Sequence, residues 1–272
     1  MDGIAIAAQF LPIKMKLEGT SLLFIAHRGE SYDAPENTLA AINLAWQRNV
    51  DAVEIDVHLS RDHHIVVIHD SHTGRLDGQF RRVRNLSLAE LKRLDAGSYR
   101  GSQWEHERIP TLREVLSTVP VSKKLLIEIK SGPAILKPLR RELDETDLSS
   151  EQIQLIGFDL GVMAQAKKLF SELKIFWVRD IRYFDWLANW RSELQRLIDR
   201  AVLAHLDGLD ISYWKTIDAS FILQVKSAGL TLYVWVVNEL EAAKDLIAAG
   251  VDGITSDRAY WLAQQLMSCN IT

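Results

Sequence analysis

Short apolar runs alternate along this chain with longer segments in which apolar residues recur at helical spacing. Several of the short runs are almost continuously apolar, which is typical of strands that are buried on both faces. The pattern predicts eight strands, at residues 22–26, 52–57, 125–129, 153–158, 174–178, 208–211, 231–237 and 253–255. Between them it predicts eight helices, at residues 38–48, 112–117, 134–143, 160–173, 184–204, 217–228, 240–249 and 258–267.

A strict alternation of eight strands with eight helices predicts an α/β fold, a single (β/α)8 barrel of the TIM type. A chain of 272 residues is long enough for one such domain. We place the barrel at residues 22–268, and residues 1–21 then form an N-terminal extension. The main alternative is a doubly wound open sheet, but no G-x-G-x-x-G motif follows any predicted strand.

One region interrupts the alternation. Residues 65–68 form a ninth strand-like run only a few residues after the second strand, which is too close for a parallel partner. We therefore expect an antiparallel hairpin with its turn at residues 60–64, and a small inserted lobe at residues 58–110, between strand 2 and helix 2. Residues 71–113 carry nine Lys or Arg and five Asp or Glu, so this stretch is basic. A solvated loop with scattered charge is the alternative interpretation.

The composition excludes several classes of protein. Hydrophobic residues make up 47% of the chain and charged residues 25%, as in ordinary globular domains. The net charge of −4 gives no overall basic field that would attract nucleic acid. Cys269 is the single cysteine, which excludes an internal disulfide and a multi-thiolate zinc site. No apolar stretch reaches 18 residues, so we expect no membrane insertion.

The first 21 residues need a separate interpretation. Residues 4–13 are mostly apolar, but Asp2 stands where a secretory signal would carry positive charge, and no A-x-A site follows at a suitable distance. We therefore expect a cytoplasmic protein. Another explanation of residues 1–14 is that translation starts at Met15, just before the first clear strand, and the expected compartment is then the same.

Three carboxylates are predicted at the carboxyl ends of neighbouring strands, where barrels of this type carry their active sites. Glu54 and Asp56 share one face of the second strand, and Glu128 lies on the next barrel strand. Buried carboxylates are costly unless a positive charge compensates them. A lone carboxylate would suggest a structural ion pair, but three together favour one divalent cation, Mg²⁺ or Ca²⁺, since all the ligands are oxygens.

Two histidines are predicted at the same rim. His27 ends the first strand and His69 ends the returning hairpin strand, so we expect them to act as general acid and general base, with His69 as the acid. Arg28 and Lys130 supply fixed positive charge there, which suits a phosphoryl group. His63 and His64 are expected on the surface of the hairpin turn. His58 faces the cluster by alternation but should lie beyond the rim.

These residues lie in an ordered series of motifs that resembles the glycerophosphodiester phosphodiesterase family. The motifs are His27-Arg28-Gly29, Pro35-Glu36-Asn37-Thr38, Glu54-Ile55-Asp56-Val57, His69-Asp70, Ile127-Glu128-Ile129-Lys130, Trp235-Val236-Val237-Asn238 and Gly250-Val251-Asp252-Gly253-Ile254. The family fold is a β/α barrel with an insertion after strand 2, in agreement with the pattern above.

The resemblance implies metal-dependent hydrolysis of small glycerophosphodiesters to sn-glycerol 3-phosphate and an alcohol. It implies that Glu54, Asp56 and Glu128 bind the metal, that His27 and His69 transfer protons, and that Arg28 and Lys130 bind phosphate. Glu36, Asn37 and Trp235 are candidates for supporting the site, although Asn37 or Thr38 could simply cap the first helix. The resemblance leaves the headgroup and the oligomeric state open.

Three alternative functions fit parts of the pattern. A related barrel phosphodiesterase could act on lysophospholipids or other phosphodiesters, with Phe80, Tyr99 and Trp104 of the inserted lobe facing lipid. A second alternative is a non-catalytic barrel that binds phosphodiesters. A barrel amidohydrolase would need an H-x-H pair on the first strand, where only His27 is present.

Overall fold

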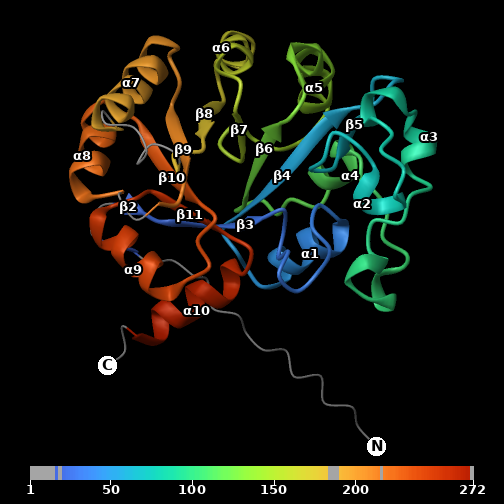
Figure 1. The fold of residues 1–272 in the computed structure, drawn as a ribbon, viewed down its shortest axis with the longest axis horizontal. Helices are drawn as coiled ribbons and strands as arrows, with labels where there is room; N and C mark the ends of the chain where they lie inside the picture. Colours follow the sequence, from blue (N-terminus) through green and yellow to red (C-terminus); the bar gives the residue numbers. More distant parts are fainter. Residues whose placement is uncertain (1–15, 18–19, 183–189, 215–216, 270–272) are drawn as a thin grey trace, which may run out of the picture.

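The structure is a computed structural model, which describes residues 16–17, 20–182, 190–214 and 217–269. In this part of the chain eight parallel strands form a closed barrel (Figure 1). They are β3 (Leu23–His27), β4 (Ala52–Leu59), β6 (Lys124–Ile129), β7 (Ile153–Gly157), β8 (Lys174–Arg179), β9 (Gly208–Ser212), β10 (Thr231–Trp235) and β11 (Gly253–Ser256). The pairing runs in order around the barrel, and β3 closes it by pairing with both β11 and β4. The predicted TIM-type barrel is confirmed.

Helices follow the strands and surround the barrel (Figure 1). They are α1 (Leu39–Gln47), α4 (Leu112–Leu116), α5 (Leu136–Asp144), α6 (Leu160–Leu169), α7 (Trp190–Leu203), α8 (Ala219–Ser227), α9 (Leu240–Ala249) and α10 (Ala259–Cys269), with a 3-10 turn η4 (Pro133–Ile135) before α5. The first part of the helix predicted at 184–204 lies outside the described residues. The backbone is left-handed at Asn49 and Gly250, directly after α1 and α9, where the sequence predicted the ends of these helices.

The alternation of side chains along each strand separates two cores. Ile55 and Ile127, like most outward-facing residues, pack between the barrel and the helices. The interior holds a smaller apolar cluster in which the Phe176 and Tyr233 rings stack with their centres 4.7 Å apart. Because Leu126 belongs to this interior cluster, Glu128 two positions further on β6 also faces inward.

The carboxyl end of β4 leaves the barrel wall and carries the predicted hairpin. Residues 57–59 pair with β5 (Ile65–Val67) in antiparallel register, and the turn closes with a hydrogen bond from the Ser60 amide to the His64 carbonyl, 2.9 Å. His63 and His64 are exposed at this turn, as predicted. The Ile68 amide then donates to the Asp56 carbonyl at 3.0 Å, which brings the following His69 back to the barrel mouth.

The segment between β5 and α4 forms a lobe at one side of the barrel (Figure 1). Its elements are short: α2 (Gly74–Asp77), η1 (Val83–Asn85), α3 (Leu88–Leu91), η2 (Ser98–Arg100) and η3 (Ser102–Trp104). A separate apolar cluster, including Val66, Leu91 and Ile109, packs beneath them. This small core holds the lobe in place against the hairpin.

A short pair of strands precedes the barrel. The short strands β1 (Lys16–Leu17) and β2 (Thr20–Ser21) pair in antiparallel register before the barrel begins. The remaining sequence positions assigned to the N-terminal extension lie outside the described residues.

In the part of the chain that the structure covers, no helix combines the length and the apolarity that a membrane span requires.

Candidate active site

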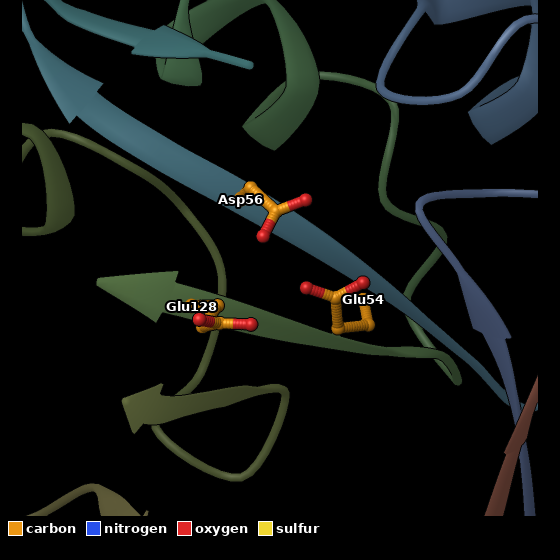
Figure 2. A group of neighbouring side chains, drawn as sticks. All are labelled: Glu54, Asp56 and Glu128. Atoms are coloured by element: carbon orange, nitrogen blue, oxygen red, sulfur yellow. The ribbon is translucent and has the colours of Figure 1, made fainter. Parts of the chain in front are cut away.

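The three predicted metal-binding carboxylates meet inside the mouth of the barrel. Asp56 on β4 is the direct register partner of Glu128 on β6, and Glu54 lies one pleat deeper on β4. Figure 2 shows their carboxylates turned toward a common space. One oxygen of each lies within 4.8 Å of the others, and all three side chains are buried.

Burial perturbs the ionisation of these acids. Desolvation, together with the Asp56 and Glu128 charges, raises the pKa of Glu54 well above its ordinary value. Desolvation and Asp56 also raise the pKa of Glu128 to about 7. Burial alone would raise the pKa of Asp56 as well, but the adjacent Arg28 and Lys130 charges bring it below the ordinary value. The cluster therefore needs more positive charge than these two side chains supply if all three acids are to ionise.

The donor set fits a divalent cation. The Oε1 atom of Glu54 is buried and has no hydrogen-bond partner among the described residues. Asp56 Oδ1 and Glu128 Oε1 are also buried, and the Lys130 ammonium, at 3.3 and 2.9 Å, is their neighbouring positive charge. Buried carboxylate oxygens left without hydrogen bonds are suitable ligands for a hard ion.

Arg28 is held at this site by its own backbone. Its φ is +56°, and its amide donates to Glu54 Oε2 at 3.0 Å. Its guanidinium lies 3.1 Å from Asp56 Oδ2 and donates to Glu36 at the same distance. The next residue, Gly29, has φ of +83°, and a Cβ there would lie 2.6 Å from the Ala41 backbone. Only glycine fits this turn, which directs Arg28 into the barrel mouth.

Both predicted histidines are oriented by carboxylates. His27 Nδ1 lies 2.7 Å from Asp257 Oδ1, and His69 Nδ1 lies 2.8 Å from Asp70 Oδ1. A proton on each Nδ1 leaves each Nε2 available for proton transfer. Burial lowers the pKa of His69, although the Asp56 charge opposes this effect.

The role of Asp257 was not predicted from the sequence. Burial would raise its pKa, but hydrogen bonds from His27, Asn238 and Ser31 lower it to about 2. Asn238 Nδ2 donates to its second oxygen at 2.7 Å, so the carboxylate is fixed from both sides. Asp257 directly follows β11, so the strand-end rule that selected the other residues could have found it.

Two of the supporting candidates contact the charged residues directly. Asn37 has φ of +57°, donates from Nδ2 to Asp56 Oδ2 at 2.8 Å and accepts from the Asp56 amide at 3.1 Å. It therefore positions Asp56, and Thr38 is the residue that caps α1. Glu36 bridges Arg28 and Arg75, at 3.1 and 2.6 Å.

These groups surround an open pocket of about 420 Å³. Its lining residues are His27, Arg28, Glu54, His69, Glu128, Lys130, Ile156, Phe158, Val178, Asp210, Trp235 and Thr255. Trp235, the third supporting candidate, packs edge-on against Phe158 and forms an apolar wall. Asp210 on β9 was not predicted, and burial followed by the Glu128 charge raises its pKa well above the ordinary value.

His58 is more buried than the sequence predicted. It is buried instead of standing beyond the rim, and its Nε2 lies 3.1 Å from the carbonyl oxygen of His69. Burial lowers its pKa. The hairpin packs over the end of β4 and covers this position, so His58 supports the backbone of His69.

The chain is similar to proteins of known family. Residues 27–260 match the model of the glycerophosphoryl diester phosphodiesterase family. This chain belongs to that family. A glycerophosphodiester phosphodiesterase from Caldanaerobacter subterraneus is 34% identical over 241 residues, which cover 86% of this chain and 93% of that protein.

Solved structures of the family share the fold. A phosphodiesterase from Oleispira antarctica, determined in complex with the product sn-glycerol-3-phosphate, has a TM-score of 0.77 and 28% identity, covering 90% of this chain and 96% of its own. A family member from Thermotoga maritima has a TM-score of 0.71 and 23% identity over 89% of this chain and 98% of its own.

Proposed function

We propose that this protein hydrolyses glycerophosphodiesters to sn-glycerol 3-phosphate and an alcohol, with the help of one divalent cation. The proposal rests above all on three buried carboxylates with too little positive charge around them, one of which, Glu54, has an oxygen without a partner among the described residues. They lie beside two cationic side chains and two carboxylate-held histidines in a member of this family. Its relatives are named for phosphodiester hydrolysis, and these groups are suited to that reaction.

Glu54, Asp56 and Glu128 would hold the cation, Mg²⁺ or Ca²⁺, through oxygen atoms. When bound, the cation supplies electrostatic stabilisation of negative charge on the phosphoryl oxygens. Asn37 keeps Asp56 in position through its two hydrogen bonds. The Arg28 amide does the same for Glu54.

Arg28 and Lys130 would bind the non-bridging phosphoryl oxygens. Both side chains are mostly buried and already lie at the carboxylate cluster, so they need little reorganisation when substrate enters. The guanidinium of Arg28 is fixed by Glu36 and Asp56, which orients its remaining N–H groups.

His27 and His69 would carry the protons. One histidine takes a proton from the attacking hydroxyl as its oxygen bonds to phosphorus. The other donates a proton to the alcohol oxygen as the P–O bond to it breaks. We assign the acid to His69, although both rings are held in the same way by a carboxylate at Nδ1. The attacking group is either water or the 2-hydroxyl of the substrate glycerol. In the second case a cyclic glycerol phosphate forms as the alcohol leaves, and water then opens the ring to give sn-glycerol 3-phosphate.

Lysophospholipids are the alternative substrates, since Phe80 is 77% exposed on the lobe and could contact lipid. Tyr99 is tied to the barrel instead, because its hydroxyl accepts a hydrogen bond from the Glu36 amide at 3.2 Å. A lysophospholipid assay beside the soluble diesters decides between the two substrate classes.

The test is an assay of metal-stripped protein on the glycerophosphodiesters of choline, ethanolamine and inositol, with Mg²⁺ or Ca²⁺ added back. We expect release of sn-glycerol 3-phosphate that depends on the added ion. Binding of these diesters without turnover under every metal condition would show a non-catalytic barrel. Faster turnover of lysophosphatidylcholine than of every soluble diester would favour the lipid substrates.

A further inference from the structure

A second cleft opens beside the proposed catalytic pocket. It has a volume of about 1150 Å³ and lies between the β4–β5 turn, the η1 segment of the lobe and the loop after β6. Lys130 lines both the pocket and the cleft, so the two meet at the group that we assign to phosphate binding. A diester whose phosphorus lies at Lys130 could therefore extend one of its two alcohols into the cleft.

The lining of the cleft is cationic. Four of its residues are Arg or Lys, and none of the lining residues in the described part of the chain is Asp or Glu. Arg61 is paired with Glu90 at 3.1 Å. Arg82 and Arg84 are exposed, and neither forms an ion pair with any residue that the structure describes. Two arginines that line the cleft thus have no ion-pair partner among the described residues.

The position of Arg82 and Arg84 suits a small anionic ligand. They belong to η1 and its N-terminal neighbour, which the lobe core holds through the buried Val83 between them. Guanidinium groups concentrated in a cleft, instead of on an open face, attract a small anion that can enter it. Arginine binds phosphate well, because its planar guanidinium can donate two hydrogen bonds to two phosphate oxygens at once.

We propose that this cleft receives the alcohol part of the diester, and that Arg82 and Arg84 select substrates whose alcohol carries a further phosphate. The inference rests on the proposed function and adds a substrate class to it. The reaction is unchanged: the P–O bond to the alcohol breaks, and the alcohol leaves with its own phosphate attached.

The experiment compares glycerophosphoglycerol with the same diester bearing a terminal phosphate on the leaving glycerol. The readout is the ratio of the two kcat/KM values. We expect the wild-type protein to prefer the phosphorylated diester by about five-fold for each arginine, as for exposed ion pairs, and this preference to shrink in about 1 M salt. In the double variant Arg82→Gln/Arg84→Gln the ratio should fall to within about two-fold of unity.

The control is Arg93→Gln, which removes one positive charge, against two in the double variant, from an exposed position of the lobe outside the cleft. It should keep the wild-type ratio. An equal fall in Arg93→Gln would show a general charge effect and overturn the inference, as would a wild-type ratio near unity. Binding to anionic phosphatidylglycerol vesicles that depends on Arg82 and Arg84, without a substrate preference, would assign the arginines to a lipid surface and also overturn it. Failure to hydrolyse either diester, while the choline, ethanolamine or inositol diester is hydrolysed, would also overturn the inference. Failure on all of these diesters would instead refute the proposed function.

Discussion

Two groups of charged side chains lie around two cavities that share Lys130, and they differ in how they are held. The carboxylates of Glu54, Asp56 and Glu128 are at most 9% exposed and stand at fixed register positions of two paired strands. Arg82 and Arg84 are exposed on a short segment of the lobe and have no ionic partner among the described residues. The first group is enclosed by the barrel, and the second is attached to it by a small separate core.

The difference determines how much each charge can contribute. Removing one partner from a buried ionic cluster leaves the others uncompensated, which costs about 3–5 kcal/mol. An exposed pair is screened by water and salt and contributes about 0–1 kcal/mol. We therefore expect chemistry to depend on the enclosed group and substrate choice to depend on the exposed one. Substitutions in the two groups test this division.

The largest effect is expected at Glu54. The Glu54→Gln substitution keeps the size of the side chain and removes the charge of one proposed metal ligand. We expect loss of divalent-ion binding by calorimetry and a fall in turnover of about 10³-fold or more, with the fold retained. Glu142→Gln, at a half-buried glutamate of α5, is the control and should change neither property. An unchanged ion stoichiometry in Glu54→Gln would refute the metal assignment.

The histidines come next. Each of His27→Ala and His69→Ala should lower turnover by about 10²-fold or more, and the pH–rate profile of the wild-type protein should be bell-shaped. The double variant should lose much less than the product of the two single losses, because the residues act as a unit.

A nitrophenyl diester separates the two histidine roles, since its leaving group needs little protonation. On this substrate His69→Ala should regain most of its rate, and His27→Ala should not. Equal rescue of both variants, or of neither, would contradict the assignment of His69 as the acid.

A smaller loss of activity, which acts through His27 alone, is expected when Asp257 is substituted. In Asp257→Asn the amide can donate to His27 Nδ1, which moves the ring proton to Nε2 and weakens His27 as a base. We expect a fall in kcat of about 10- to 100-fold, the range found when a residue that orients a histidine is changed, and a displaced limb of the pH–rate profile.

The control for Asp257 is Asp252→Asn. Asp252 precedes β11 at its other end and is paired with Lys226 at 2.6 Å. This variant should lose stability without displacing the pH profile. If both variants only lost stability, Asp257 would have no role in positioning His27.

The smallest effect concerns acid stability. The pKa of Asp257 is lowered from 3.8 to about 2 in the folded protein, so its ionisation stabilises the fold above about pH 4. That contribution is lost as the pH falls through about 2. Because Asp257 is one-third exposed, we expect less than about 1 kcal/mol, measured by denaturant unfolding of wild-type and Asp257→Asn protein at both ends of this range. A difference between the two proteins that stays constant with pH would contradict the prediction.

Several features of the site could be predicted from local patterns. The period of two along β4 predicts that Glu54 and Asp56 share a face, and the structure places both in the barrel interior. The short distance between β4 and β5 predicts the hairpin, which the antiparallel register confirms. The interpretation of the lobe as only a solvated loop was incomplete, because the lobe has its own core.

Other contacts could not be predicted, because they join distant parts of the chain. Asp257 reaches His27 across 230 positions only because β11 pairs with β3 when the barrel closes. The motif makes Asn37 a candidate for supporting the site, but which residue it contacts depends on its left-handed backbone, which turns the side chain toward Asp56. His58 was expected beyond the rim, and the hairpin that folds over β4 buries it.

Short-range patterns in the sequence were enough to predict the order of strands and helices, the inward face of each strand and the residue types at the strand ends. Tertiary structure decided which charges are compensated. The electrostatic energy of a side chain depends on burial and on neighbours within a few ångströms, and in a closed barrel those neighbours come from every part of the chain. Thus the sequence could name Glu128 and Arg84 as charged residues. Only the fold shows that the first is buried with a pKa of about 7 and that the second is exposed in an open cleft.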